Sequence, residues 1–584
     1  MVPSCTLVDA MSNRFQLALG GALIGLFTII RLPLLSTHFT HVDDIGVAST
    51  ILKAKTQPSV YEGLKGRIYD TAHPEYLSNK YRVFRFADKI GILSRLETVK
   101  VLFIVSLTWT YAPLQFLLTG FLIHANTSYE QNLILGRSPS LLAFLAGCFL
   151  LILLTRKIYN NDWWLPAIFG LILLGLSWQN IIYSVHMASY AIGVPALIAA
   201  LLIYLQTTED SPSGIFKLGQ YGIFLAMTFA AQYQMLLFLP AIFGGIFLFR
   251  RSKILPIGIF FAALALPTYY LFFHDFSGRS LNWNIGPAGE YLYNIRSQFG
   301  LADKLLYSFH FFASNFWEVF QSDVSMVPED SIFFTPINTV LFALFLLGLA
   351  SFFRSGNGAK QRLRPVIVFI LATWLLLIIS GKVALSPTRH TLILLPMIVL
   401  SIIEGIQVMG RYLGLRFSFI FSMAFAAICL TGFFRNYAGI VQIRRNKIVP
   451  HELRDHIQKH EASLLYSYDW TYDPLLMRKT LPDNLPIFVR EFSTIPAPLP
   501  TNERRPLAIA FLSHRRPLNE QIFEELLPDL RKMYPEKILA LNWKNSSKVF
   551  ESNAPGAVEV DFLPRTLNGK NGLFLTIIVF PGFK

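Results

Sequence analysis

The sequence predicts a mostly α-helical, polytopic membrane protein of eleven to thirteen spanning helices, followed by a soluble α/β domain. Of its 584 residues, 53% are hydrophobic and only 15% are charged, whereas about a quarter of the residues in an ordinary soluble domain are charged. Apolar runs long enough to cross a bilayer recur up to residue 435, after which they shorten and charged residues become more frequent. We therefore expect a membrane domain at 1–435 and an extra-cytoplasmic domain at 436–584.

Charge and cysteine content exclude several classes of protein. The net charge of +15 is typical of a membrane protein whose Lys and Arg residues gather in cytoplasmic loops. These residues are scattered between apolar runs, so no nucleic-acid partner is expected. The three cysteines are too few and too far apart for a disulfide framework. Arg14 precedes the first apolar run, but no small-residue cleavage site follows before Arg31, which indicates an uncleaved span.

Eleven apolar runs are candidate spans. They are 15–35, 139–155, 163–181, 187–206, 215–231, 233–249, 254–273, 335–353, 365–384, 391–409 and 415–434. Residues 101–123 are equally apolar, but Pro113 interrupts them, and proline breaks a helix interior. We predict one external loop over 37–138, with 101–123 lying along the membrane interface as broken helices. The alternative is a true span here and a missed span elsewhere.

Orientation follows from four basic clusters, which we expect on the cytoplasmic side. They are Arg156-Lys157, Arg250-Arg251-Lys253, Arg354 with Lys360-Arg362-Arg364, and Arg411 with Arg416. The N-terminus is then inside. Outside lie the first loop (37–138), a second aromatic-rich loop (274–334) and the C-terminal domain. The glycosylation sequons at Asn126 and Asn545 fall on the outside as well.

The C-terminal domain is expected to contain short strands and one helix. Short apolar runs at 463–470, 486–490, 506–512 and 573–580 predict buried strands. The segment from Asn519 to Met533 has helical spacing, with its apolar residues on one face. These elements predict a small α/β domain.

The acidic pair Asp43-Asp44 is the leading candidate for catalysis, because it follows directly on the first span. Carboxylates at a membrane edge are costly and usually functional. A base must lie within hydrogen-bond reach of the proton that it takes. The alternative is structural, since Asp is a good N-cap for a helix that begins near Ile45.

Neighbouring histidines raise the possibility of a metal site. His38, His41 and Asp43 are plausible ligands for a divalent cation. The same spacing is common by chance, and solvated loop histidines are the more frequent case. No other cofactor is expected.

Arginines at the external ends of spans are candidate ligands for a lipid phosphate. Arg389-His390 lies at the external end of a late span, against the positive-inside trend, and guanidinium binds phosphate through paired donors. Snorkelling to the headgroups is the alternative. Arg137 has a similar place, although Ser138-Pro139 also suits a helix start. Arg279, in the second loop, completes these candidates. Tyr183, His186 and Tyr190 are expected to pack at the interface rather than bind ligands.

Together, these motifs resemble the GT-C superfamily of membrane glycosyltransferases. The likeness is closest to the protein O-mannosyltransferase and lipid A aminoarabinose transferase branch, and it covers about residues 1–435. The resemblance rests on the order of five short motifs rather than on any one of them. They are Arg31-Leu-Pro33, Asp43-Asp44, Tyr111-Ala-Pro113, Arg137-Ser-Pro-Ser140 and Pro387-Thr-Arg-His390 with Pro396.

The resemblance implies sugar transfer from a polyprenyl-phosphate donor to an acceptor hydroxyl, with inversion. The acid matched by Asp43 would deprotonate the acceptor, and cations such as Arg389 would stabilise the departing phosphate. Tyr111, His390, Arg137 and Arg279 complete the expected substrate-binding set.

The sequence also departs from the family pattern. Asp44 stands where many members have Glu, Ala112-Pro113 replaces a histidine followed by two prolines, and His73-Pro74 is an alternative match to that motif. The phosphate-binding lysine of the family has no clear counterpart. The donor sugar and the acceptor (glycan, lipid or protein) therefore stay open.

The sequence thus predicts a bacterial inner-membrane enzyme with its site on the extra-cytoplasmic side. A flippase or transporter for a lipid-linked sugar is the main alternative. It predicts internal repeats with broken helices near the midplane, and no repeat is evident. A non-catalytic assembly factor would need neither the acid nor the arginine.

Overall fold

The computed structural model describes most helices and strands of the chain, in two compact units. The described residues are 6–36, 47–48, 51–52, 55, 89–90, 112–124, 126–187, 190–209, 214–270, 302, 306, 316–317, 320–321, 324, 334–354, 358–379, 391–445, 450–468, 479–490, 499, 506–514, 518–537, 541–554 and 573–581. One unit comprises Met1–Leu32, Thr110–Gln115 and Pro139–Gly439, and the other Pro33–Trp109, Phe116–Ser138 and Ile440–Lys584. Each is described by itself below.

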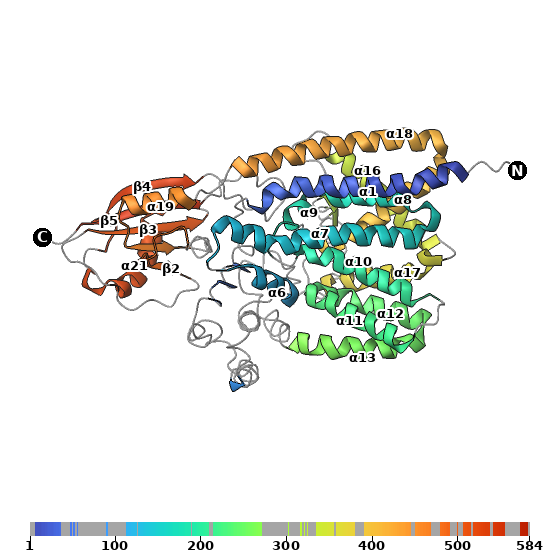
Figure 1. The fold of residues 1–584 in the computed structure, drawn as a ribbon, viewed down its shortest axis with the longest axis horizontal. Coiled ribbons are helices and arrows are strands. Elements are labelled where there is room, and N and C mark those ends of the chain that lie inside the picture. The colour runs from blue at the N-terminus through green and yellow to red at the C-terminus, as the bar shows by residue number, and fades with distance from the viewer. Residues whose placement is uncertain are drawn as a thin grey trace. The chain divides into compact units, whose positions relative to one another are not determined.

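Long apolar helices make up the first unit (Figure 1). Six stretches of the described chain are long and apolar enough to cross a membrane, which confirms the predicted mostly helical membrane fold. The helices are α1 (Thr6–Leu35), α7 (Tyr129–Tyr159), α8 (Trp164–Leu176), α9 (Trp178–Tyr183), α10 (Tyr190–Thr207), α11 (Ile215–Ala231), α12 (Leu239–Phe249), α13 (Arg251–Thr268), α16 (Phe334–Arg354), α17 (Gly358–Ile379) and α18 (Leu395–Arg445). The total number of crossings stays a prediction.

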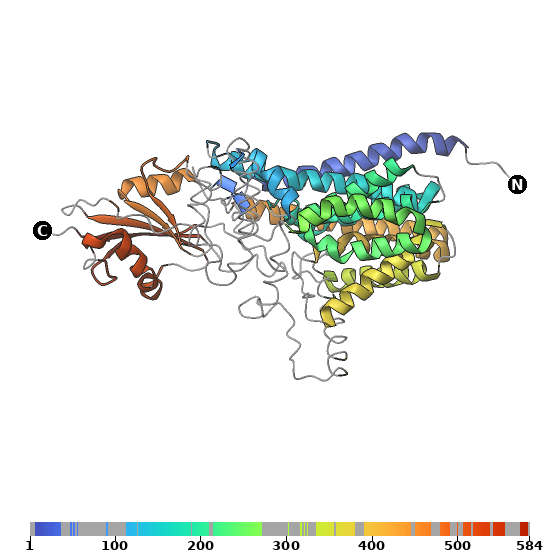
Figure 2. The same ribbon diagram turned by 90° about the horizontal axis from the view of Figure 1, so that it is seen from below.

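Helix α10 is the buried centre of this unit. Nearly all of its side chains are buried, as expected of a helix that is apolar on every side. It contacts α11, α12, α17, and the 3₁₀ turns η2 (Tyr233–Leu237) and η5 (Leu392–Leu394). Figure 2 shows the surrounding helices from below. A Cβ atom on Gly193 would lie close to both Gln232, next to η2, and Ile393 of η5, so both turns meet the N-terminal end of α10.

Helix α18 contains two predicted spans, 391–409 and 415–434, in one unbroken run of 51 helical residues. A Cβ atom on Gly170 would lie 2.9 Å from Ile403 Cδ1, while the ring of Phe425 is 4.7 Å from that of the adjacent residue, Phe169. A straight helix would hold residues 403 and 425 about 33 Å apart. Side chains cannot reach across that distance to adjacent residues of α8, so α18 bends between these positions. Gly410 and Gly414 lie in the bent stretch.

Two glycines allow α16 and α18 to cross at backbone contact. A Cβ atom on Gly348 would overlap the carbonyl oxygen of Ser401, and one on Gly405 would overlap that of Leu344. Small residues permit this approach between membrane helices. The crossing fixes how α16 packs on the first half of α18.

A five-stranded mixed sheet forms the C-terminal domain of the second unit (Figure 1). Its strands are β1 (Leu464–Ser467), β2 (Ile487–Val489), β3 (Leu507–His514), β4 (Ser547–Ala554) and β5 (Leu573–Phe580), in the order β2-β1-β3-β5-β4. β1 is parallel to β2 and β3, while β5 is antiparallel to β3 and β4. The four predicted strands are confirmed. β4 was not predicted, because its sequence is mostly polar and lacks an apolar run.

Two helices of the described part of the chain accompany the sheet. α21 (Glu520–Met533) begins after Asn519, whose side chain accepts a hydrogen bond from the Ile522 amide, as expected of an N-cap. Its apolar face packs on the sheet through Ile522, Leu526 and Leu530. The second helix, α19 (Pro450–Lys459), was not predicted. Figures 1 and 2 show the two helices on opposite sides of the sheet.

A tyrosine links the sheet of this domain to α21. Tyr466 is fully buried, and its hydroxyl donates to Asp529 Oδ2 at 3.0 Å. Burial and the adjacent Asp529 carboxylate raise the pKa of the Tyr466 hydroxyl above its usual value. The tyrosine therefore stays neutral and donates across the pH range of cells.

Candidate functional site: the exit of the first spanning helix

One predicted site residue, Arg137, lies within the described part of the chain. The others fall outside it: Asp43, Asp44, His38, His41, Tyr111, Arg279, Arg389 and His390. Their roles stay predictions. The described residues that flank Asp43 and Asp44 in sequence show how this segment is held at both ends.

Arg137 binds the C-terminal end of α1. Its Nη1 donates to the carbonyl oxygens of Leu34 at 3.0 Å and Leu35 at 3.1 Å, and the residue is completely buried. The last four carbonyls of a helix have no partner within it, and the negative end of the helix dipole favours a cation. A buried unsatisfied carbonyl would cost about 1–3 kcal/mol. Arg137 thus fixes the point at which the chain leaves α1.

The local sequence of α7 keeps the helix intact around Arg137. Pro139 has no amide hydrogen for the carbonyl of Leu135 one turn earlier, and the Ser138 hydroxyl donates to that oxygen instead, at 2.7 Å. The prediction that Ser138-Pro139 starts a helix is wrong, because α7 begins at Tyr129. The prediction relied on the general preference of proline for the first turn of a helix. It did not consider that the Ser138 hydroxyl can bind the carbonyl that Pro139 leaves without a donor.

The chain after the acidic pair is also anchored. Val47, Ala48, Ile51 and Leu52 are helical and almost completely buried. Next, Lys55 Nζ donates to the carbonyl oxygen of Ile123 at 2.6 Å, at the end of α6 (Pro113–Leu122). In sequence, Asp43 and Asp44 therefore lie between two segments that are each held by buried contacts.

Further side chains donate hydrogen bonds to the backbone carbonyls of the turn between α6 and α7. The Asn132 amide binds the carbonyls of His124 and Thr127, and Lys479 of the C-terminal domain donates to the carbonyl of Asn126 at 2.8 Å. Lys479 and Lys55 therefore bind neighbouring carbonyls of one turn. α6 begins at Pro113, in agreement with the predicted break there, whereas residues 101–111 lie outside the described part of the chain.

Within the first unit, Arg31 is a second fully buried arginine that sequence reasoning did not assign to a site. It donates through Nε to Ser184 Oγ at 2.7 Å, through Nη1 to the Phe27 carbonyl at 2.9 Å and through Nη2 to the Gly175 carbonyl at 3.1 Å. Its guanidinium lies 3.7 Å from the ring centroid of Phe144. Arg31 thus joins α1 to the end of α8, where the chain breaks before α9.

Buried polar groups gather where α7 enters this unit, beside the turn that follows α9. Gln115 donates to Ser140 Oγ at 3.2 Å, and Ser140 in turn donates to the carbonyl of His186. The rings of Tyr183 and His186 lie 5.2 Å apart, and those of Tyr183 and Tyr190 lie 5.8 Å apart. The side chains of His186 and Tyr190 thus both pack against Tyr183.

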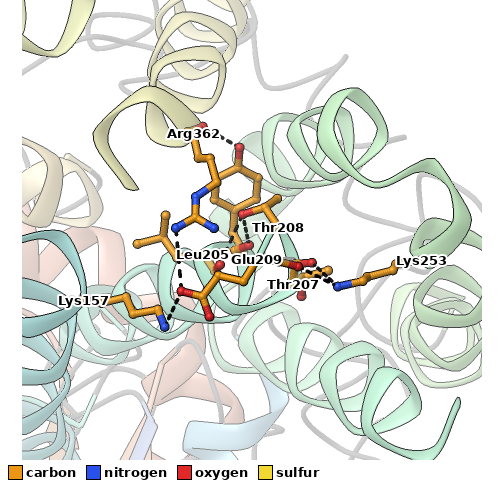
Figure 3. A network of polar contacts seen from close by, with 8 residues as sticks. Lys157, Leu205, Thr207, Thr208, Glu209, Lys253 and Arg362 are labelled. Atoms are coloured by element: carbon orange, nitrogen blue, oxygen red, sulfur yellow. Dashed lines mark hydrogen bonds and ion pairs between the residues drawn. The ribbon is translucent and has the colours of Figure 1, made fainter. Parts of the chain in front are cut away.

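The predicted cytoplasmic clusters come together around two carboxylates. Glu209 lies 2.5 Å from Lys157 Nζ and 3.7 Å from Arg362 Nη2, and Lys253 donates to the carbonyls of Thr207 and Glu209 (Figure 3). These contacts join α7, α13 and α17 to the end of α10.

The second carboxylate, Glu404, is fully buried. It lies 2.7 Å from Lys360 Nζ and 3.4 Å from Arg411 Nη2, and it accepts a hydrogen bond from the Ser351 hydroxyl at 2.7 Å. Through Glu209 and Glu404, all four basic clusters contribute to one end of the unit, as expected if they share a side of the membrane.

Among the described residues, no group of three or more His, Cys, Asp or Glu side chains could hold a metal. His38, His41 and Asp43 lie outside those residues, so the metal hypothesis stays untested.

Comparisons with known proteins give a likeness in fold. No protein-family model matches the chain, and neither does any curated protein. Two crystal structures of ArnT from Cupriavidus metallidurans are similar over nearly their full length. The apo structure has 9% identity and a TM-score of 0.45, covering 97% of this chain and 99% of ArnT. The structure bound to undecaprenyl phosphate has 10% identity and a TM-score of 0.48, covering 98% and 100%.

ArnT is a lipid A aminoarabinose transferase, so these structures come from the branch that the sequence motifs resemble. The likeness is one of fold.

Proposed function

We propose that this protein is an integral membrane glycosyltransferase that moves a sugar from a polyprenyl-phosphate donor to an acceptor hydroxyl outside the cytoplasm. The observation that carries the proposal is that Asp43 and Asp44 follow, eight and nine residues beyond Leu35 in sequence, a spanning helix whose end Arg137 holds. Acids at a membrane edge are usually functional, and a catalytic group must be held in a defined position. The motif order of the GT-C superfamily supports the same reading.

In the proposed reaction, the Asp43 carboxylate accepts the proton of the acceptor hydroxyl. The acceptor oxygen then forms a bond to the anomeric carbon as the bond from that carbon to the phosphate oxygen breaks. The lipid phosphate leaves with the electron pair, and nearby cations stabilise its charge. Arg389 and His390 are our candidates for that role, since guanidinium and imidazolium bind phosphate oxygens. No step of this scheme requires a metal.

The ion pairs around Glu209 and Glu404 favour an enzyme over the alternative, a transporter. A transporter must open towards the cytoplasm during each cycle. Here α7, α10, α13 and α17 are joined around Glu209, and α16, α17 and α18 around Glu404, at the end that the charge rule assigns to the cytoplasm. Opening would require breaking the ion pairs of the fully buried Glu404, which is costly, together with those of the partly exposed Glu209.

The deciding experiment is sugar transfer by the purified protein from a radiolabelled polyprenyl-phosphate sugar pool, comparing wild type with Asp43→Asn. Loss of a general base typically costs about 10²–10⁴-fold in rate. We expect a loss of that size in a variant that folds and binds donor lipid as the wild type does.

Equal transfer by both proteins would overturn the assignment of Asp43 and make Asp44→Asn the next variant. If neither protein transfers sugar although both bind the donor, the transporter alternative is favoured instead.

A further inference from the structure

We infer that Arg137 and Lys55 are positioning residues, which hold the two ends of the segment that carries Asp43 and Asp44. The inference rests on the proposed function for its catalytic consequence. It replaces the expectation that Arg137 binds the lipid phosphate.

Burial and bonding of Arg137 favour a positioning role. The residue has no exposed surface, and one guanidinium nitrogen already donates to two carbonyl oxygens of the last turn of α1. A ligand for the donor phosphate would have to present its donors to a lipid that enters and leaves. Arg137 instead satisfies carbonyls of Leu34 and Leu35, which are themselves buried.

Lys55 holds the other end of the segment. Its Nζ donates to the carbonyl of Ile123 at 2.6 Å and lies 3.4 Å from His124 Nδ1. The helical residues just before it, Ile51 and Leu52, are buried. A cation at the C-terminal end of α6 also interacts favourably with the helix dipole. The acidic pair thus lies in sequence between two charge-assisted contacts, one at the end of each helix.

The chain provides a matched control. Lys479 donates to the carbonyl of Asn126 in the same turn, with comparable geometry at 2.8 Å, but it belongs to the C-terminal domain. Lys479→Gln removes one lysine–carbonyl bond, as Lys55→Gln does, but from a residue that is remote in sequence from the acids.

The test compares kcat and KM for the lipid donor in the full-length variants Arg137→Gln, Arg137→Lys, Lys55→Gln and Lys479→Gln. Misplacement of a catalytic group by about 1 Å can cost about 100-fold in rate. We expect a fall in kcat towards that size for Arg137→Gln and a smaller fall for Lys55→Gln, with donor KM nearly unchanged. Arg137→Lys should recover part of the rate, and Lys479→Gln should behave as wild type.

A raised donor KM with unchanged kcat in Arg137→Gln would overturn the inference in favour of phosphate binding. Wild-type kcat in both Arg137→Gln and Lys55→Gln would overturn it as well.

Hydrogen exchange gives a readout that does not depend on catalysis. We expect faster exchange of peptides covering 34–55 in Arg137→Gln and Lys55→Gln than in Lys479→Gln. Equal exchange in all three would refute the anchoring. If the wild type transfers no sugar while this difference is seen, the proposed function fails but the anchoring stands. Arg137→Lys serves for the same comparison if Arg137→Gln does not fold.

Discussion

Buried charges in the helical unit are neutralised in two different ways. Arg31 is held by main-chain carbonyls, a serine hydroxyl and the face of Phe144, so helix ends and a π system stabilise its charge. Glu404 is held by two cations and a hydroxyl. The first arrangement fixes a helix end, and the second ties three helices together.

Glu209 and Glu404, the two carboxylates bound by the basic clusters, should differ in their contribution to the free energy of unfolding. Removing one partner of a buried ion pair costs about 3–5 kcal/mol, whereas exposed pairs contribute about 0–1 kcal/mol. Glu404 is fully buried, while the side chain of Glu209 is 32% exposed. We expect Glu404→Gln to lower the free energy of unfolding by several times more than Glu209→Gln does.

Reversible unfolding in mixed micelles would measure both values. Added salt should reduce the smaller effect of Glu209→Gln and leave that of Glu404→Gln nearly unchanged, because buried pairs are screened less. Equal losses in the two variants would show that burial does not set the strength of these pairs.

At the scale of elements, the crossing of α16 and α18 depends on glycine. A methyl group at Gly348 or Gly405 would meet a backbone carbonyl of the other helix, which cannot rotate away as a side chain can. We expect Gly348→Ala and Gly405→Ala each to destabilise the protein by about 1–3 kcal/mol, as overpacking typically does. Thermal unfolding in detergent would measure the loss.

Gly25→Ala in α1 is the matched control, because nothing lies within 4 Å of the added methyl group. Alanine favours helix by up to about 1 kcal/mol over glycine, so this variant should be neutral or slightly more stable. A Gly405→Ala variant as stable as Gly25→Ala would contradict the close crossing.

Helix α18 shows how one continuous helix can supply two predicted spans. The basic pair Arg411 and Arg416, which predicted a cytoplasmic turn, lies in the stretch where the contacts of Ile403 and Phe425 require a bend. Charge pattern and packing therefore agree on a reversal here, although the backbone stays helical.

For the whole molecule, the orientation in the membrane is the main prediction to test. The charge rule puts the Arg250–Lys253 cluster inside and the C-terminal domain outside. Ser252 and Lys544 are both exposed and report on these two parts. In a background without the three native cysteines, we expect a membrane-impermeant maleimide to label Lys544→Cys in intact cells. It should label Ser252→Cys only after the membrane is opened.

Labelling of both variants in opened membranes is the control for reactivity. Labelling of Ser252→Cys but not Lys544→Cys in intact cells would reverse the orientation and place the proposed site on the cytoplasmic side.

The sequence by itself determined the fold class, most helices of the membrane part, four of the five strands and the helix after Asn519. These features follow from local signals, namely runs of apolar residues, their period and capping residues, which any stretch carries without its neighbours. It also singled out the acidic pair and Arg137, because charge at a membrane edge is conspicuous.

Only the tertiary structure decided what the charged residues bind. The local sequence around Arg137 or Arg31 does not reveal a binding partner. In the structure, each donates hydrogen bonds to a carbonyl of a helix distant in sequence. The polar strand β4 forms because β5 offers it an edge to pair with, and the bend of α18 is visible only through its contacts with α8. Partners across the fold are set by packing of remote segments, and no local pattern encodes them.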